Sequence, residues 1–99
     1  MIAIVWEFVV KPEALAAFQR AYGPTGDWAA LFRQSPGFEG TTLLQDGATG
    51  TRFLTIDRWT DLAHYDEMRR SSRQEYARLD EVCAELTVSE RALGIFTIA

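Results

Sequence analysis

The segment from Thr51 to Met68 changes its hydrophobic period part-way along, which restricts the chain to folds in which a strand leads directly into a helix. Between residues 52 and 59 the side chains alternate as in a strand, and one face of that strand is predicted to carry Phe53, Thr55, Asp57 and Trp59. After Asp61 the apolar residues recur every three positions, at Leu62, Tyr65 and Met68, which predicts a helix capped by Thr60 or Asp61. Trp59 and Tyr65 can therefore face the same space between sheet and helix.

The residues before this segment predict two strands with helices between them. The strand Ile2–Val10 is apolar on both faces, which is typical of a central strand that is covered twice. Lys11 and Pro12 open a helix that ends at Gly23 and Pro24, and a second short helix follows from Thr25 or Asp27 to Ser35. The next strand, 38–45, is joined by the turn-rich stretch 46–50 to the strand that ends at Trp59.

The residues after Met68 predict a break, a long helix and a last strand. Ser71 and Ser72 mark the break, and a helical stripe runs from Tyr76 to Leu86 and includes Cys83, whose position indicates packing. The stretch Thr87–Glu90 matches a capping box and predicts one more helical turn, which leaves Leu93–Ile98 as the last strand.

The order of these elements predicts an α+β fold of the split βαβ, ferredoxin-like type, with one four-stranded antiparallel sheet and a single domain over residues 1–99. Helices can cover only one face of that sheet. Because the strand Ile2–Val10 is apolar on both faces, we expect a second copy of the chain to cover the other face, giving a homodimer.

Charge and residue content exclude several classes of partner and cofactor. The net charge is −4 and the ten cations are spread along the chain, so we expect no binding to nucleic acid. The first ten residues include Glu7 and form too short an apolar run for a membrane span, which predicts a cytoplasmic protein without membrane attachment. With one histidine and one cysteine, the chain cannot form an internal disulfide or a cysteine-based zinc site, and we expect no metal or prosthetic group.

Three features together resemble the antibiotic biosynthesis monooxygenase family: the SPGF run at Ser35–Phe38, the hairpin, and the FLTIDRW strand followed by a helix with Tyr65. The resemblance implies a dimeric α+β barrel in which two sheets pack face to face and each subunit holds a small pocket. It also implies chemistry, since some members oxidise polycyclic phenols or quinols with molecular oxygen and no cofactor. Other members degrade haem, and many have no established activity.

The resemblance transfers to some positions and fails at others. Quinone-forming members carry a tryptophan at the end of this strand and a tyrosine six positions later, and these match Trp59 and Tyr65. Their asparagine four residues before the tryptophan corresponds to Thr55, and this chain contains no asparagine. Haem-degrading members need a helical tryptophan where Met68 stands and a histidine that His64 does not match, so haem degradation is disfavoured.

Each candidate site residue has two interpretations. Tyr65 can donate a proton to a substrate oxygen on which charge develops, and Asp57 can accept a proton from a phenol, with Trp59, Thr55 and Met68 as substrate-binding residues. Alternatively, Trp59 and Tyr65 are core residues and Asp57 pairs with an arginine at a surface or interface. We expect His64 to be exposed, and Arg69, Arg70, Arg73 and Arg78 to form a solvated, ion-paired helix face with Glu67, Glu75 and Asp80.

Two functions therefore follow from the sequence. The first is a cofactor-independent monooxygenase that acts on an aromatic, phenolic or quinol-type small molecule, and Trp59 with Tyr65 favours it. The second is a non-catalytic dimeric protein of the same fold that binds small molecules or serves in stress, and the missing asparagine favours it.

Overall fold

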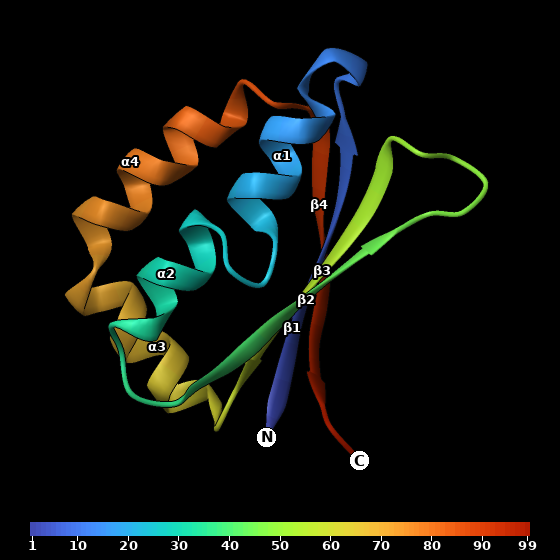
Figure 1. Cartoon of the computed structure of the whole chain (residues 1–99). Helices are drawn as coiled ribbons and strands as arrows, with labels where there is room; N and C mark the ends of the chain where they lie inside the picture. The colour runs from blue at the N-terminus through green and yellow to red at the C-terminus, as the bar shows by residue number, and fades with distance from the viewer.

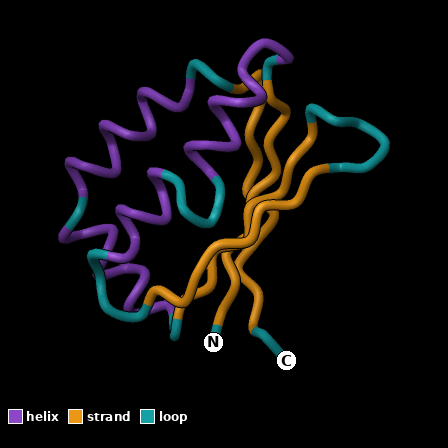
Figure 2. Tube along the Cα trace, viewed as in Figure 1, coloured by secondary structure: helices purple, strands orange, loops and turns teal.

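The computed structural model describes all residues from Met1 to Ala99, and places every helix on one face of a four-stranded sheet (Figures 1 and 2). In chain order the elements are β1 (Ile2–Val10), the 3-10 turn η1 (Pro12–Ala14), α1 (Leu15–Tyr22), α2 (Asp27–Arg33), β2 (Phe38–Gln45), β3 (Arg52–Trp59), α3 (Leu62–Ser71), α4 (Arg73–Ala84) and β4 (Thr87–Thr97). The strand order is β2-β3-β1-β4 and every neighbouring pair is antiparallel. This confirms the predicted ferredoxin-like α+β fold with β1 inside the sheet.

The core lies between the sheet and the helices, where one face of each strand meets the apolar stripes of α1 and α2. Its centre is aromatic: the ring of Phe18 lies 4.3 Å from Tyr22, 5.0 Å from Phe53 and 5.3 Å from Phe8, centroid to centroid. Phe18 and Phe53 are completely enclosed. Such contacts hold β1 and β3 against α1, and they fix the side of the sheet on which a cavity can form.

The opposite face of the sheet has no helix over it (Figure 1). The strand register places Val5, Ile56, Leu44 and Phe96 on this face, and the last two are 45% and 51% exposed. The face also carries Glu7, which accepts a hydrogen bond from Arg52 Nε at 2.7 Å and forms an ion pair with Arg91 Nη2 at 3.0 Å. An apolar sheet face crossed by a few ion pairs is typical of a surface that binds another subunit.

The predicted helical turn at Thr87–Glu90 is wrong, because these residues begin β4. Thr87 pairs with Val10 and Glu90 with Phe8, so backbone pairing along β1 outcompetes the local capping signal. The last strand is therefore longer than predicted, and it contains register shifts opposite Val5/Trp6 and Val9/Val10. Gly94 lies at the shift opposite Val5/Trp6, and its φ of 146° is a conformation that favours glycine.

The strand-to-helix change after Trp59 is confirmed in detail. Asp61 caps α3, since its carboxylate accepts from the backbone N–H of His64 at 2.9 Å. Met68 is completely buried, whereas Leu62 is 44% exposed, so the buried stripe begins one turn later than predicted. None of the helices is both long and apolar enough to cross a membrane.

Candidate functional site

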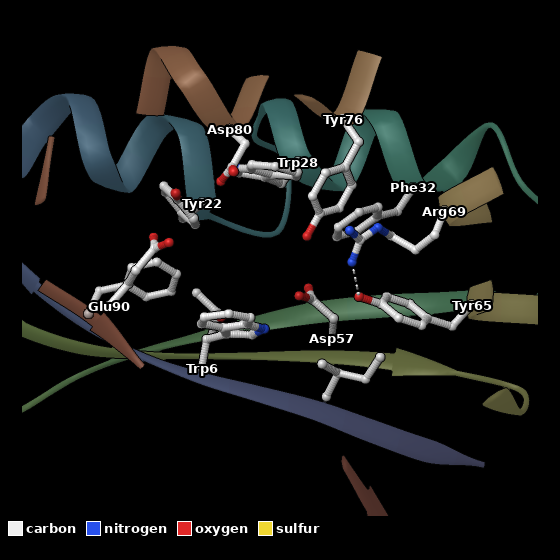
Figure 3. Close-up of a pocket in the computed structure, with 13 residues that line it drawn as sticks. Trp6, Tyr22, Trp28, Phe32, Asp57, Tyr65, Arg69, Tyr76, Asp80 and Glu90 are labelled. Carbon is white, nitrogen blue, oxygen red and sulfur yellow. Dashed lines mark hydrogen bonds between the residues drawn. The ribbon is translucent and has the colours of Figure 1, made fainter. Parts of the chain in front are cut away.

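A cavity of about 210 Å³ lies between the sheet and the helices, and 13 residues line it (Figure 3). Strands β1, β3 and β4 supply its floor, and α1, α2, α3 and α4 supply the opposite wall. Eight of the lining residues are hydrophobic, and most of these are aromatic. A planar aromatic ligand matches such walls, because ring faces and edges pack favourably against one another.

The floor places a carboxylate among aromatic rings. Trp6 and Thr55 are cross-strand partners on the face that meets the helices, and Asp57 lies two residues further along β3 on the same face, opposite Ile4. Asp57 forms no ion pair, and the hydroxyl of Thr41 on β2 donates to its Oδ1 at 2.5 Å. Burial raises the pKa of Asp57 to about 6, although the Thr41 hydrogen bond and the charge of Arg58 oppose the rise. Asp57 is thus a proton acceptor poised close to neutral pH.

Tyr65 and Arg69 lie at one end of the cavity and act as a pair (Figure 3). They are four residues apart on α3, so both side chains leave the same side of the helix. Arg69 Nη1 donates to the Tyr65 hydroxyl oxygen at 3.1 Å, and the guanidinium lies 4.0 Å from the centre of the Tyr76 ring. The Tyr65 oxygen already accepts this charged donor, which leaves its own O–H free to donate to a ligand.

Tyr76 adds a second hydroxyl to the wall facing Asp57 (Figure 3). Burial holds the pKa of Tyr76 above its ordinary range, and the nearby Tyr65 adds to that rise. Tyr76 therefore stays protonated and remains a donor under all physiological conditions.

Trp59 and Met68 do not line the cavity. Both are completely buried, and the Trp59 ring is enclosed by Phe38 at 5.2 Å, Phe32 at 5.6 Å and Tyr65 at 5.7 Å. The Trp59 indole N–H has no hydrogen-bond partner. Trp59 thus lies behind Tyr65 and supports its ring, whereas Thr55, Asp57 and Tyr65 reach the cavity itself.

Several lining residues were not predicted from the sequence as site residues. Arg69 and Asp80 are exposed, as expected for a solvated helix face, but they also line the cavity and form no salt bridge. Arg70 does pair with Glu67 at the surface at 2.6 Å. Glu90 was missed because its segment was expected to be helical. Trp6 and Trp28 lie at apolar spacings in their strand and helix, and nothing in those spacings distinguishes a cavity wall from a core.

His64 takes no part in the cavity. Its side chain is 42% exposed, and its Nδ1 lies 2.7 Å from the Asp61 carboxylate at the start of α3. No three histidine, cysteine, aspartate or glutamate side chains of the chain converge on a point where a metal ion could lie. The polar chemistry of the cavity thus comes from carboxylates, phenols, indoles and one guanidinium.

Comparison with known proteins agrees with this fold. The family model for antibiotic biosynthesis monooxygenase matches residues 1–78. The chain belongs to this family. Members of the family typically assemble as dimeric α+β barrels. No curated protein matches the sequence.

Several solved structures share this fold over nearly the whole length of both chains. A point variant of SnoaB, a cofactor-independent oxygenase from Streptomyces nogalater, superimposes with a TM-score of 0.81 at 24% identity, covering 98% of this chain and 91% of that one. Rv0793 from Mycobacterium tuberculosis gives 0.71 at 18% identity, over 99% and 94%. PA3566 from Pseudomonas aeruginosa gives 0.69 at 18%, over 99% and 94%. At these identities the likeness establishes the fold.

Proposed function

We propose that this protein is a cofactor-independent monooxygenase that oxidises a small phenol or quinol-type aromatic molecule. The observation that carries the proposal is the carboxylate of Asp57, with its pKa raised to about 6, on the floor of an aromatic cavity opposite the Tyr65–Arg69 pair. A cavity of about 210 Å³ is smaller than the roughly 300–1,000 Å³ of sites for drug-sized ligands, which favours a molecule of a few fused rings.

Asp57 is assigned the role of general base. A carboxylate with a pKa of about 6 is mostly ionised at neutral pH and is still more basic than an exposed aspartate. It removes the proton of the substrate hydroxyl, and the resulting anion is electron-rich enough to react with molecular oxygen. Thr41 keeps the carboxylate oriented through its hydrogen bond to Oδ1.

The Tyr65–Arg69 pair is assigned the role of stabilising the negative charge that develops on the substrate oxygen. The Tyr65 hydroxyl donates to the substrate oxygen, and the Arg69 guanidinium, which already donates to Tyr65, strengthens that donor. Donors that are already fixed toward the developing charge stabilise an anionic oxygen more than water molecules that must reorient.

The reaction balances with oxygen as the sole oxidant. The ionised ring forms a carbon–oxygen bond to O₂ and becomes a hydroperoxide, taking up one proton. Loss of water from this hydroperoxide breaks the O–O bond and leaves a carbonyl. One oxygen atom ends in the product and the other in water, and the ring carbon, oxidised from CH₂ to C=O in the keto form of the substrate, supplies all four electrons.

We further propose that the chain is a homodimer built on the uncovered sheet face. Val5, Ile56, Leu44 and Phe96 make that face apolar, and a second copy would cover it in the manner typical of the family. A permanent interface of this kind buries upward of about 2,000 Å² in total.

The alternative is a dimeric protein that binds an aromatic molecule without turnover. Thr55 favours it, because a hydroxyl stands in the cavity where the quinone-forming members that the sequence resembles carry an amide. Thr55 is 4% exposed and offers one donor where an amide offers two.

Oxygen consumption distinguishes the monooxygenase from the binding protein without turnover. Anthrones and naphthols are supplied to the purified protein in an oxygen electrode, with each compound's spontaneous oxidation subtracted. The monooxygenase proposal predicts one O₂ consumed per quinone formed, and a large loss of rate in Asp57→Asn but not in the surface control Asp66→Asn. Binding of the same compounds with no oxygen uptake above background would favour the alternative.

A further inference from the structure

Two carboxylates without a counter-ion lie at the end of the cavity away from Tyr65. The carboxylates of Asp80 on α4 and Glu90 on β4 both line the cavity while remaining exposed to solvent, and neither takes part in any salt bridge or side-chain hydrogen bond (Figure 3). Burial raises the pKa of Glu90, and the charge of Asp80 raises it further, so the two groups lie close enough to repel. Arg69, the one cation that lines the cavity, pairs with neither.

Aromatic rings surround these carboxylates. Phe8 is the cross-strand partner of Glu90, the Tyr22 ring lies 4.8 Å from Phe8, and the Trp28 ring lies 6.0 Å from Tyr22. Tyr22 and Trp28 are each only 7% exposed. The faces of such rings carry partial negative charge and attract cations.

Tyr22 adds a hydroxyl to the same end. The neighbouring Trp28 indole N–H has no hydrogen-bond partner. Burial holds the pKa of Tyr22 above its ordinary range, so this hydroxyl stays neutral and its oxygen can accept from a donor. Two carboxylates and a hydroxyl oxygen thus leave acceptors for a ligand that brings several N–H donors.

We infer that this end of the cavity, formed by Phe8, Tyr22, Trp28, Asp80 and Glu90, is a subsite for a protonated amine, so that the ligand is an aromatic molecule with an alkylammonium substituent. An ammonium group relieves the repulsion between the carboxylates and presents its positive charge to the ring faces. A metal ion fits less well, because indole and phenyl rings offer it no ligand. The inference rests on the proposal that the cavity holds an aromatic ring, and it adds which substituent that ring bears.

The two ends of the cavity would then orient the ligand. Arg69 repels an ammonium group from the Tyr65 end, while Asp80 and Glu90 attract it to the other. The ring lies between them, above Asp57, with its hydroxyl directed toward the proposed base and the Tyr65 donor. A carboxylate substituent in place of the amine would meet two like charges and be rejected.

The test compares three probes of one shape by isothermal titration calorimetry at pH 7: 1-naphthylmethylamine, 1-naphthalenemethanol and 1-naphthoic acid. We expect the amine to bind about ten-fold or more tighter than the alcohol, and the acid to bind more weakly than both. Glu90→Gln and Asp80→Asn should each lower the amine's affinity about ten-fold and leave the alcohol's within about two-fold. Glu81→Gln makes the same change of charge at an exposed position of α4. It should leave the ratio of amine affinity to alcohol affinity unchanged.

The outcomes separate this inference from the proposed function. The subsite inference is overturned if the amine and the alcohol bind with equal affinity, or if Glu81→Gln and Glu90→Gln lose the same amount of amine affinity. Either result leaves the proposed aromatic cavity in place. If none of the three probes binds, the cavity does not accept an aromatic ring, and both the subsite and the proposed function fail. Unchanged binding of the alcohol in each variant confirms that the variant is folded.

Discussion

Replacing Asp57 by asparagine should stabilise the protein at neutral pH while it greatly lowers turnover. Asparagine keeps the shape of the side chain and an oxygen that accepts from Thr41, and it removes a charge that burial disfavours. The pKa of Asp57 rises from 3.8 to about 6 in the folded chain, and a rise of this size corresponds to about 3 kcal/mol of free energy. This energy is the cost of keeping the ionised base in the cavity.

The sign of the effect depends on pH in a defined way. Between about pH 4 and pH 6 the native state holds a proton on Asp57 that the unfolded chain has already lost, so the parent protein loses stability as pH rises through this window. Above about pH 6 the penalty is constant. The asparagine variant has no such penalty, so its advantage should be close to zero near pH 4 and reach up to about 3 kcal/mol by pH 8.

Urea unfolding, followed by tryptophan fluorescence at fixed protein concentration, measures the difference. Parent and Asp57→Asn are compared at pH 4 and pH 8, with Asp66→Asn on the exposed face of α3 as the control. Equal stability at pH 8, or an advantage of the same size at both pH values, would refute the claim that Asp57 is held ionised against its surroundings.

Three further predictions concern the cavity and the sheet. Tyr65→Phe should lower turnover about 10²- to 10³-fold with little change in KM, because only the donor to the developing oxyanion is lost; steady-state oxygen uptake measures it, and an unchanged rate removes the role. Trp59→Phe should lower the free energy of unfolding by about 1–3 kcal/mol and leave ligand affinity nearly unchanged, since Trp59 packs behind Tyr65; thermal denaturation and calorimetry together check this, and weaker binding without lost stability would contradict it. Ile56→Lys should convert the dimer to monomers in sedimentation velocity at micromolar concentration, whereas Glu81→Gln should not; a parent that sediments as a monomer would reject the dimer.

The fold could be predicted from the sequence because its signals are local and redundant. The alternation that ends at Trp59 and the three-residue spacing that begins at Leu62 each predict one element, and the Asp61 cap marks the boundary between them. The one error of element type, at Thr87–Glu90, arose where a local capping signal competed with pairing along β1. Non-local pairing of this kind leaves no mark within a four-residue window.

The cavity could be predicted only in part. Strand alternation placed Thr55 and Asp57 on the helix-facing side, and helical spacing placed Tyr65 opposite them. Periodicity gives the direction of a side chain and does not give the depth to which it is buried, which is why Trp59 and Met68 were expected in the cavity and lie behind it. Arg69 was expected in solvent because its charge fits a surface pattern, and it is exposed. Its guanidinium also stacks on Tyr76, and this contact could not be predicted because it depends on how α3 and α4 pack.

The pH dependence of kcat/KM tests the central claim most directly, because it asks whether an ionised Asp57 is required for turnover. With a substrate whose own hydroxyl ionises well above pH 8, kcat/KM should rise with pH and level off above an apparent pKa of about 6. The same inflection should be absent from the residual activity of Asp57→Asn. A profile that is flat from pH 5 to pH 8 in the parent protein, or an inflection that persists in Asp57→Asn, would contradict the assignment of Asp57 as the base.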